Sequence, residues 1–125
     1  MLRGMKHALL IISHGSRRAA SNEEVFELTA QIREFGAGMR VECAFLEITE
    51  PTVQQKIDEL AAAGTTDIQV FPHFLAGGAH VTKDIPREIQ TAQNKHPAIT
   101  FQLLPHLGSL DELPSLIFKT VKADS

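Results

Sequence analysis

The chain has 125 residues, of which 43% are hydrophobic and 22% are charged, and its net charge is −3. This length supplies one globular domain with a core, and the composition excludes a disordered, collagen-like or coiled-coil protein. Without a basic run, and with neither Trp nor Tyr, the chain lacks the charge and the stacking surface typical of nucleic-acid binding. Its longest apolar run, residues 8–12, is far too short to cross a bilayer. We therefore expect neither a nucleic-acid nor a membrane partner.

Cys43 is the single cysteine, so the chain can form no internal disulfide. It lies within an apolar run, where a buried and inert thiol is expected. A lone reduced cysteine favours a cytoplasmic location.

Four short apolar, β-branched runs alternate along the chain with stretches of helical periodicity. Continuous apolar runs of this length are typical of strands buried on both faces of a parallel sheet. The predicted strands are residues 8–12, 41–46, 68–71 and 99–104.

Helices are predicted after each of these strands from apolar side chains at helical spacing. Ser21 with Glu24 predicts a capping box at the start of the first helix. Pro51 suits the first position of the second helix, and Pro86 places the start of the third near Asp84. The expected stripes are Val25, Leu28, Ile32 and Phe35; Val53, Ile57 and Leu60; Ile85, Ile89 and Ala92; and Leu113, Leu116, Ile117 and Val121.

The strict alternation of strands and helices indicates an α/β fold. We predict one domain over residues 1–125, a three-layer sandwich whose four-stranded parallel sheet is flanked by helices in flavodoxin-like βα repeats. In open sheets of this kind, ligands bind beyond the carboxyl ends of the strands. The residues directly after each strand are therefore the candidate site residues.

Three ionisable residues, His14, Glu47 and His80, follow predicted strands and are spaced 33 residues apart each time. One βα repeat has about this length, so all three should emerge at the same edge of the sheet. Two imidazoles and a carboxylate suit divalent cobalt, nickel, iron or zinc, and three protein ligands leave coordination positions open. The alternative is that two of them are solvated loop residues with a coincidental spacing.

Glycines near the predicted strand ends are weaker evidence for a ligand site than the three ionisable residues. Gly15 and Ser16 open the first strand–helix turn, but neither a dinucleotide-binding fingerprint nor a P-loop is present. The pair Gly77 and Gly78 either brings backbone close to a ligand or allows a tight turn. Nucleotide binding is thus poorly supported.

Three segments resemble the sirohydrochlorin cobaltochelatase family, the class II tetrapyrrole chelatases. They read LLIISHGSR, FLEITEPTVQQKIDEL and VFPHFLAGGAHVTKDIP, and the similarity covers roughly residues 6–108. The third is the most specific, because it looks like the loop after strand three that carries a metal-binding histidine. The length is similar to that of the short, single-domain members.

The resemblance implies a chelatase fold and insertion of a divalent metal into sirohydrochlorin. It assigns His14 as metal ligand and proton acceptor, His80 as second metal ligand, and Glu47 as acidic ligand with a part in catalysis. His73 departs from the family, where an apolar residue is common. The metal is a substrate, with cobalt favoured and nickel or iron as alternatives, and no organic cofactor is implied. Substrate contacts are implied for Glu50, Leu75, Ala76, Gly77, Gly78 and Ala79.

Two other hypotheses stay open beside a chelatase of the cobalamin pathway. One is a carrier that binds metal or tetrapyrrole without turnover, and the other is an iron or nickel chelatase for sirohaem or a nickel tetrapyrrole. A homodimer is also expected, because a large flat tetrapyrrole needs a two-walled cleft and this chain supplies one wall.

Overall fold

The computed structural model describes residues 6–36 and 38–122; residue 37 and the two ends of the predicted domain lie outside the described residues. Four parallel strands form one sheet in the order β2-β1-β3-β4. The predicted strands are confirmed to within one residue at each end, and so is the α/β fold class. The strands are β1 (His7–Ser13), β2 (Arg40–Phe45), β3 (Asp67–Pro72) and β4 (Thr100–Leu103).

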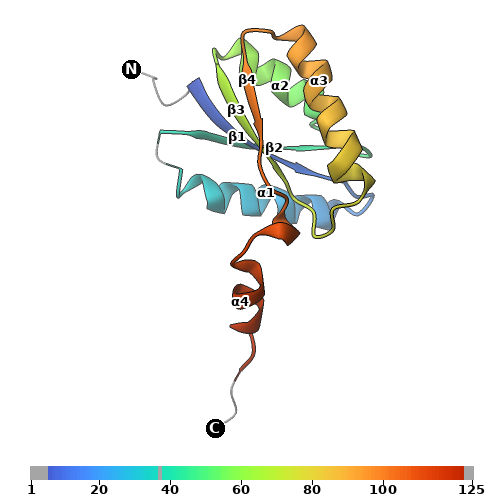
Figure 1. Ribbon diagram of the computed structural model, residues 1–125, viewed down its shortest axis with the longest axis vertical. Helices are drawn as coiled ribbons and strands as arrows, with labels where there is room; N and C mark the ends of the chain where they lie inside the picture. The colour runs from blue at the N-terminus through green and yellow to red at the C-terminus, as the bar shows by residue number, and fades with distance from the viewer. Residues whose placement is uncertain (1–5, 37, 123–125) are drawn as a thin grey trace.

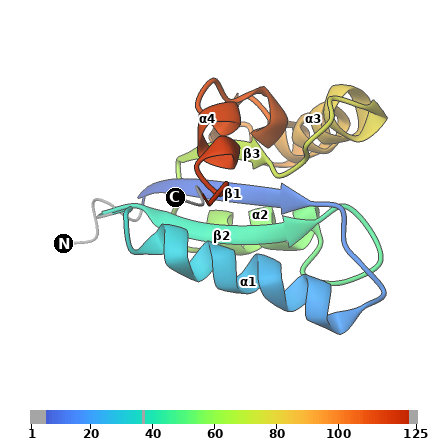
Figure 2. The same ribbon diagram turned by 90° about the horizontal axis from the view of Figure 1, so that it is seen from below.

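Helices cover both faces of the sheet. Helix α1 (Ala19–Arg33) packs on one face, while α2 (Val53–Ala62) and α3 (Ile85–Lys95) pack on the other (Figures 1 and 2). The chain moves outward from β1 to β2, then crosses back to β3 and β4. The direction of winding therefore reverses between β1 and β3, and such a switch point is where open α/β sheets place their ligand crevice.

Alternate side chains of the strands enter the two halves of the core. Burial on both faces explains why the strands appear in the sequence as continuous apolar runs rather than alternating ones. On the α1 face, Cys43 is buried between strands and helix, and this burial raises the pKa of its thiol, as expected for an inert cysteine. The larger cluster under α2 and α3 contains Leu10, Ile12, Ile57, Leu60, Ile68, Val70 and Ile85.

The start of α1 differs from the prediction. The helix begins at Ala19 with Arg18 as its N-cap, and no side chain caps it, so the capping box of Ser21 and Glu24 is wrong. Instead, the buried side chain of Asn22 accepts from the Ser16 amide at 2.9 Å and donates to the Ser16 carbonyl at 2.8 Å. These two bonds fix the turn before the helix, so the helix can start upstream of Ser21.

The starts of α2 and α3 are set by different means. Helix α2 begins at Val53 with Thr52 as its N-cap, so the prediction that Pro51 is its first residue is wrong. The side chains of Thr52 and Gln55 form a reciprocal capping box. Helix α3 starts at Ile85, which confirms the start predicted near Asp84. A π-helical turn, η2 (His80–Asp84), runs directly into it.

The predicted stripes of α2 and α3 are confirmed as core, whereas that of α1 packs on the sheet only in part and that of α4 does not pack on it. In α1, Val25 and Ile32 pack on the sheet, whereas Phe35 lies beyond the helix end and is 89% exposed. Helix α4 (Leu113–Phe118) projects away from the layers (Figure 1), and its stripe faces solvent. The exposed side chains are Leu116, Ile117, Phe118 and Val121.

The direction of α4 follows from the turn before it, η3 (Leu107–Ser109). The Gly108 amide donates to the Phe74 carbonyl at 3.1 Å, which ties this turn to the loop after β3. The chain therefore leaves the domain at the sheet edge instead of folding back over a face. No helix within the described ranges is long and apolar enough to span a membrane.

Candidate metal and substrate site

His14, Glu47 and His80 come together at the carboxyl edge of the sheet. His14 directly follows β1, Glu47 lies just beyond β2, and His80 begins η2 after the loop that leaves β3. His14 Nε2 lies 3.3 Å from a Glu47 carboxylate oxygen. The rings of His14 and His80 meet edge to face with centroids 4.7 Å apart. The 33-residue spacing thus places all three beside the switch point between β1 and β3.

The hydrogen bonds of His14 define which nitrogen faces the site. Its Nδ1 lies 2.9 Å from the Gly15 carbonyl, which can only accept, so Nδ1 carries the hydrogen. In the neutral ring, Nε2 then holds a lone pair directed at the Glu47 carboxylate. A proton or a metal ion placed between these two electron-pair donors, which are 3.3 Å apart, would be bound by both of them. This pair can therefore accept either one.

His80 is held from three sides. Its Nδ1 lies 2.8 Å from an Asp84 carboxylate oxygen. Phe74 stacks on the ring with centroids 5.9 Å apart, and the ring of His14 approaches from another side. With Nδ1 engaged, the remaining nitrogen, Nε2, is available to a ligand, as is usual for histidines that bind metals.

Gly15 brings the loops after β1 and β2 together. Its φ is +101°, and a β-carbon at this position would collide with the Glu47 carbonyl. The Glu47 amide donates to the His14 carbonyl at 3.0 Å, and the next residue, Ile48, has a φ of +76°. Only glycine permits this close approach, which brings the Glu47 side chain to His14.

The three candidate ligands are near one another in pairs. Across residues 6–36 and 38–122, no three His, Cys, Asp or Glu side chains already surround one point as they would around a bound metal ion. The His14 and Glu47 side chains are 40% and 56% exposed, so both have room to rotate toward a shared ion. An open arrangement suits a metal that must be released.

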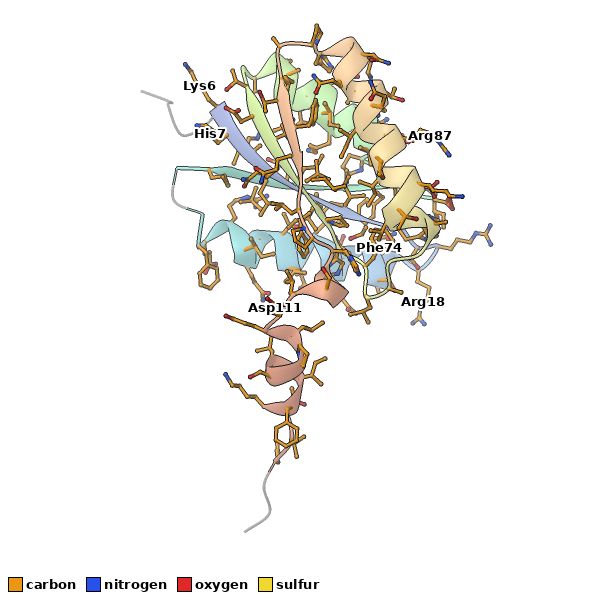
Figure 3. All side chains as sticks on the ribbon, viewed as in Figure 1. Lys6, His7, Arg18, Phe74, Arg87 and Asp111 are labelled. Atoms are coloured by element: carbon orange, nitrogen blue, oxygen red, sulfur yellow. The ribbon has the colours of Figure 1, made fainter. Side chains whose placement is uncertain are left out.

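Two clefts lie on either side of the segment that follows β2. One, of about 220 Å³, contains both Glu47 and Asp84; the other, of about 580 Å³, contains Arg17 and Ile48. Arg18 and Arg87 extend outward from this edge into solvent (Figure 3). The site is thus bordered by cationic side chains. A third cleft, of about 210 Å³, includes His7 and Asp67 and lies at the opposite, amino edge of the strands.

The loop of Leu75, Ala76, Gly77, Gly78 and Ala79 is exposed at the site, and Leu75 is 71% exposed. The segment after β4 holds this loop in place, because Gly108 packs directly on the Leu75 carbonyl and the His106 ring lies against Gly77. Ile48 faces solvent nearby at the end of β2, with 52% of its surface exposed. Exposed apolar side chains beside a polar cluster are typical of a ligand-binding surface.

Glu50 and His73 also follow strands that end at this edge of the sheet. The Glu50 carboxylate accepts a hydrogen bond of 3.2 Å from Gln55 at the start of α2. His73 follows β3, and its amide donates to the Ile12 carbonyl at 2.8 Å. Burial lowers the pKa of the His73 side chain, which favours its neutral form.

Sequence reasoning missed three contributors to the site: Phe74, Asp84 and Ile48. Asp84 carried a signal, since a carboxylate four residues after His80 lies on the same helical face. The exposure of Ile48 depends on its positive φ and has no such signal.

An open α/β sheet with two histidines and a carboxylate at its switch point defines a ligand-binding protein with a candidate metal site. The family CbiX matches residues 8–124, so the chain belongs to this family. One relative is the sirohydrochlorin cobaltochelatase of Methanosarcina barkeri, 36% identical over 94% of this chain and 95% of the relative. The enzyme of the same name in Methanopyrus kandleri is 39% identical over 64% of this chain, a match that spans only 56% of the relative. The sirohydrochlorin ferrochelatase of Bacillus subtilis is 28% identical over 94% of this chain and 45% of its own length.

Solved structures confirm the fold. A CbiX protein from Marinobacter aquaeolei VT8 matches with a TM-score of 0.80 and 26% identity over 91% of this chain and 92% of its own. The sirohydrochlorin chelatase SirB from Bacillus subtilis subspecies spizizenii, solved in complex with cobalt, matches with a TM-score of 0.80 and 28% identity. That match covers 90% of this chain and 48% of SirB, so this chain corresponds to about half of the larger chelatase.

Proposed function

We propose that this chain is a chelatase that inserts a divalent metal ion into sirohydrochlorin, with cobalt as the favoured metal. The observation that carries the proposal is the grouping of His14, Glu47 and His80 at the switch point, in a chain of the CbiX family. Cobaltochelatases among the relatives support cobalt, and the likeness to the cobalamin biosynthesis protein of Marinobacter aquaeolei VT8 supports the cobalamin pathway. A cytoplasmic setting agrees with the single unpaired, buried thiol.

Metal insertion requires two events at this site. The two pyrrole protons of the macrocycle must leave while the metal ion is transferred to the ring nitrogens. His14 is the proton acceptor: once the metal ion has left Nε2, its lone pair takes a pyrrole proton, and the Glu47 carboxylate 3.3 Å away stabilises the imidazolium that forms. The ring is 40% exposed, so it releases each of the two protons in turn to solvent. His14, Glu47 and His80 together hold the ion before transfer. Two imidazoles and one carboxylate suit cobalt, nickel and iron alike.

The surroundings suit a flat polycarboxylate. Arg17 and Arg87, in the two clefts, attract the carboxylates of the substrate. The exposed side chains of Ile48 and Leu75 contact the apolar face of the macrocycle. Glu50 and the loop of residues 75–79 border this contact.

The proposal is tested by mixing the purified protein with excess sirohydrochlorin and Co²⁺ and following the absorbance spectrum of the macrocycle. We expect conversion of many equivalents of sirohydrochlorin per chain at a rate above that of the protein-free mixture. Conversion that stops at one equivalent would identify a carrier instead. Parallel reactions with Ni²⁺ and Fe²⁺ rank the metals.

Glu47→Gln should weaken Co²⁺ binding about 10- to 100-fold while leaving measurable insertion. The amide keeps the size of the side chain but removes its charge, so one ligand of three is altered rather than lost. Titration of the metal-free variant with Co²⁺, followed by its visible absorption, measures the effect. Glu27→Gln, at an exposed carboxylate within α1, is the matched control. Equal Co²⁺ affinity in Glu47→Gln and the parent protein would remove Glu47 from the site.

We also propose that the protein works as a homodimer. The chain corresponds to 48% of SirB, so two copies supply the amount of chain that one larger chelatase has. Helix α4 offers an apolar surface of Leu116, Ile117, Phe118 and Val121 that faces solvent in the single chain. A second copy would cover this surface, and pairing about a two-fold axis is the commonest arrangement.

Phe118→Asp should shift the protein from dimer to monomer at micromolar concentration, as read by light scattering. Phe118 is 74% exposed in the single chain, and a carboxylate there would be buried without a partner in the dimer. Phe35→Asp is the control, because Phe35 is equally free of the core but lies at the end of α1. A parent protein with the mass of one chain that still inserts metal would contradict the dimer.

A further inference from the structure

Asp84 lies where the π-helical turn η2 continues into α3, and its own backbone is already helical, with φ −70° and ψ −45°. Its side chain makes no hydrogen bond to a backbone amide of α3. One carboxylate oxygen lies 2.8 Å from His80 Nδ1, and the other lies 3.6 Å from Arg87 Nη1. The carboxylate thus lies between the candidate metal ligand His80 and Arg87 of α3.

The π-helical turn explains how this contact arises. In η2 the Ile85 amide donates to the His80 carbonyl, five residues back, which widens the turn relative to an α-helix. Residues four apart in such a turn lie nearly above one another, so the Asp84 carboxylate meets the back of the His80 ring. Single π-turns of this kind occur frequently at functional sites.

The contact determines which nitrogen of His80 can bind a metal. An ionised carboxylate only accepts, so His80 Nδ1 carries the hydrogen and the lone pair of the neutral ring is on Nε2. Phe74 and His14 hold the two sides of the ring. Without Asp84, the ring could adopt the other tautomer, in which Nε2 carries a hydrogen and binds no metal.

We propose that Asp84 is a positioning residue that fixes the tautomer and the orientation of His80, so that Nε2 is presented to the metal substrate. Asp84 acts through His80 and is not itself a ligand, because both of its oxygens are directed at His80 and Arg87. The inference rests on the proposed function for the identity of the metal. The state of the metal-free ring is a property of this chain alone.

The test uses Asp84→Ala and Asp84→Asn in the full chain, with two readouts. The first is the ¹⁵N chemical shifts of the His80 ring in metal-free protein, at a pH where the ring is neutral. We expect the Nδ1–H tautomer in the parent and a mixture of tautomers in Asp84→Ala. The second is Co²⁺ affinity, which should fall about 10- to 100-fold in Asp84→Ala. Asp84→Asn keeps an acceptor oxygen of the same size and should give an intermediate loss.

Asp58→Ala is the matched control. Asp58 lies 2.8 Å from His96 Nε2, so this variant also removes a carboxylate from a histidine, but at a pair that joins α2 to the end of α3. It should leave both readouts at the parent values. His80→Ala identifies the share of Co²⁺ affinity that depends on His80.

The outcomes separate this inference from the proposed function. If the protein binds Co²⁺ through His80 but never inserts it, the chelatase proposal fails and the role of Asp84 stands. If Asp84→Ala keeps the parent tautomer and the parent Co²⁺ affinity, the inference is overturned whatever the activity. Asp84→Asn, which preserves shape, decides the question should the alanine variant fail to fold.

Discussion

His14→Ala should lower the rate of metal insertion by about 100-fold or more, the scale on which removal of a general base acts. The variant would lose two proposed functions together, because His14 Nε2 is the proposed proton acceptor and, beside Glu47, a proposed metal ligand. The side chain is 40% exposed and lies beyond the core, so the fold should be retained. Initial rates at saturating Co²⁺ measure the loss of proton transfer separately from the loss of metal binding.

His96→Ala is the control for this experiment. His96 also lies within hydrogen-bond distance of a carboxylate, that of Asp58, but it lies at the end of α3 opposite to the end that adjoins the candidate site. Its substitution should leave insertion at the parent rate. An insertion rate for His14→Ala within a few-fold of the parent would show that another group takes the pyrrole protons, and His73, whose pKa is lowered by burial, would be the next residue to test.

The layout of the sheet and the grouping of three ionisable residues at one of its edges were predictable because they depend on local sequence patterns. Strands buried on both faces are continuously apolar, so β1 to β4 are visible in the sequence. A regular βα repeat puts residues of equal spacing at one edge, which is why His14, Glu47 and His80 could be grouped before any geometry was known. Their role as metal ligands stays a prediction.

The start of α1 and the packing of α4 were predicted wrongly for the same reason. Each depends on a contact with a residue that the local sequence pattern does not identify. Ser21 and Glu24 have the spacing of a capping box, but the two bonds of Asn22 to Ser16 start α1 earlier. The apolar stripe of α4 is real, yet the bond from Gly108 to Phe74 directs the helix away from the sheet. An apolar stripe on a helix predicts that another apolar surface packs against it. It does not indicate whether that surface belongs to the same chain or to a second copy.

Gly15→Ala should both destabilise the protein and impair its site. The β-carbon would collide with the Glu47 carbonyl, and the residue would keep an unfavourable φ of +101°. Strain of this kind at a packed position should cost about 3 kcal/mol or more of unfolding free energy. To relieve the collision, the Glu47 backbone must move away from β1, which separates its carboxylate from His14 Nε2. A displacement of about 1 Å at a reacting group can cost on the order of 100-fold in rate.

Gly64→Ala separates the two causes of this effect. Gly64 ends α2 with a φ of +91°, close to that of Gly15, but a β-carbon there meets nothing within 4 Å. This variant therefore carries the backbone strain without the collision, and it should cost only about 1 kcal/mol with normal Co²⁺ binding. Urea unfolding and Co²⁺ titration of both variants give the comparison. If Gly15→Ala loses no more stability than Gly64→Ala and binds Co²⁺ as the parent does, the contact between Gly15 and Glu47 does not hold the site together. If only Gly15→Ala loses metal affinity, the approach of these two loops is what places Glu47 beside His14.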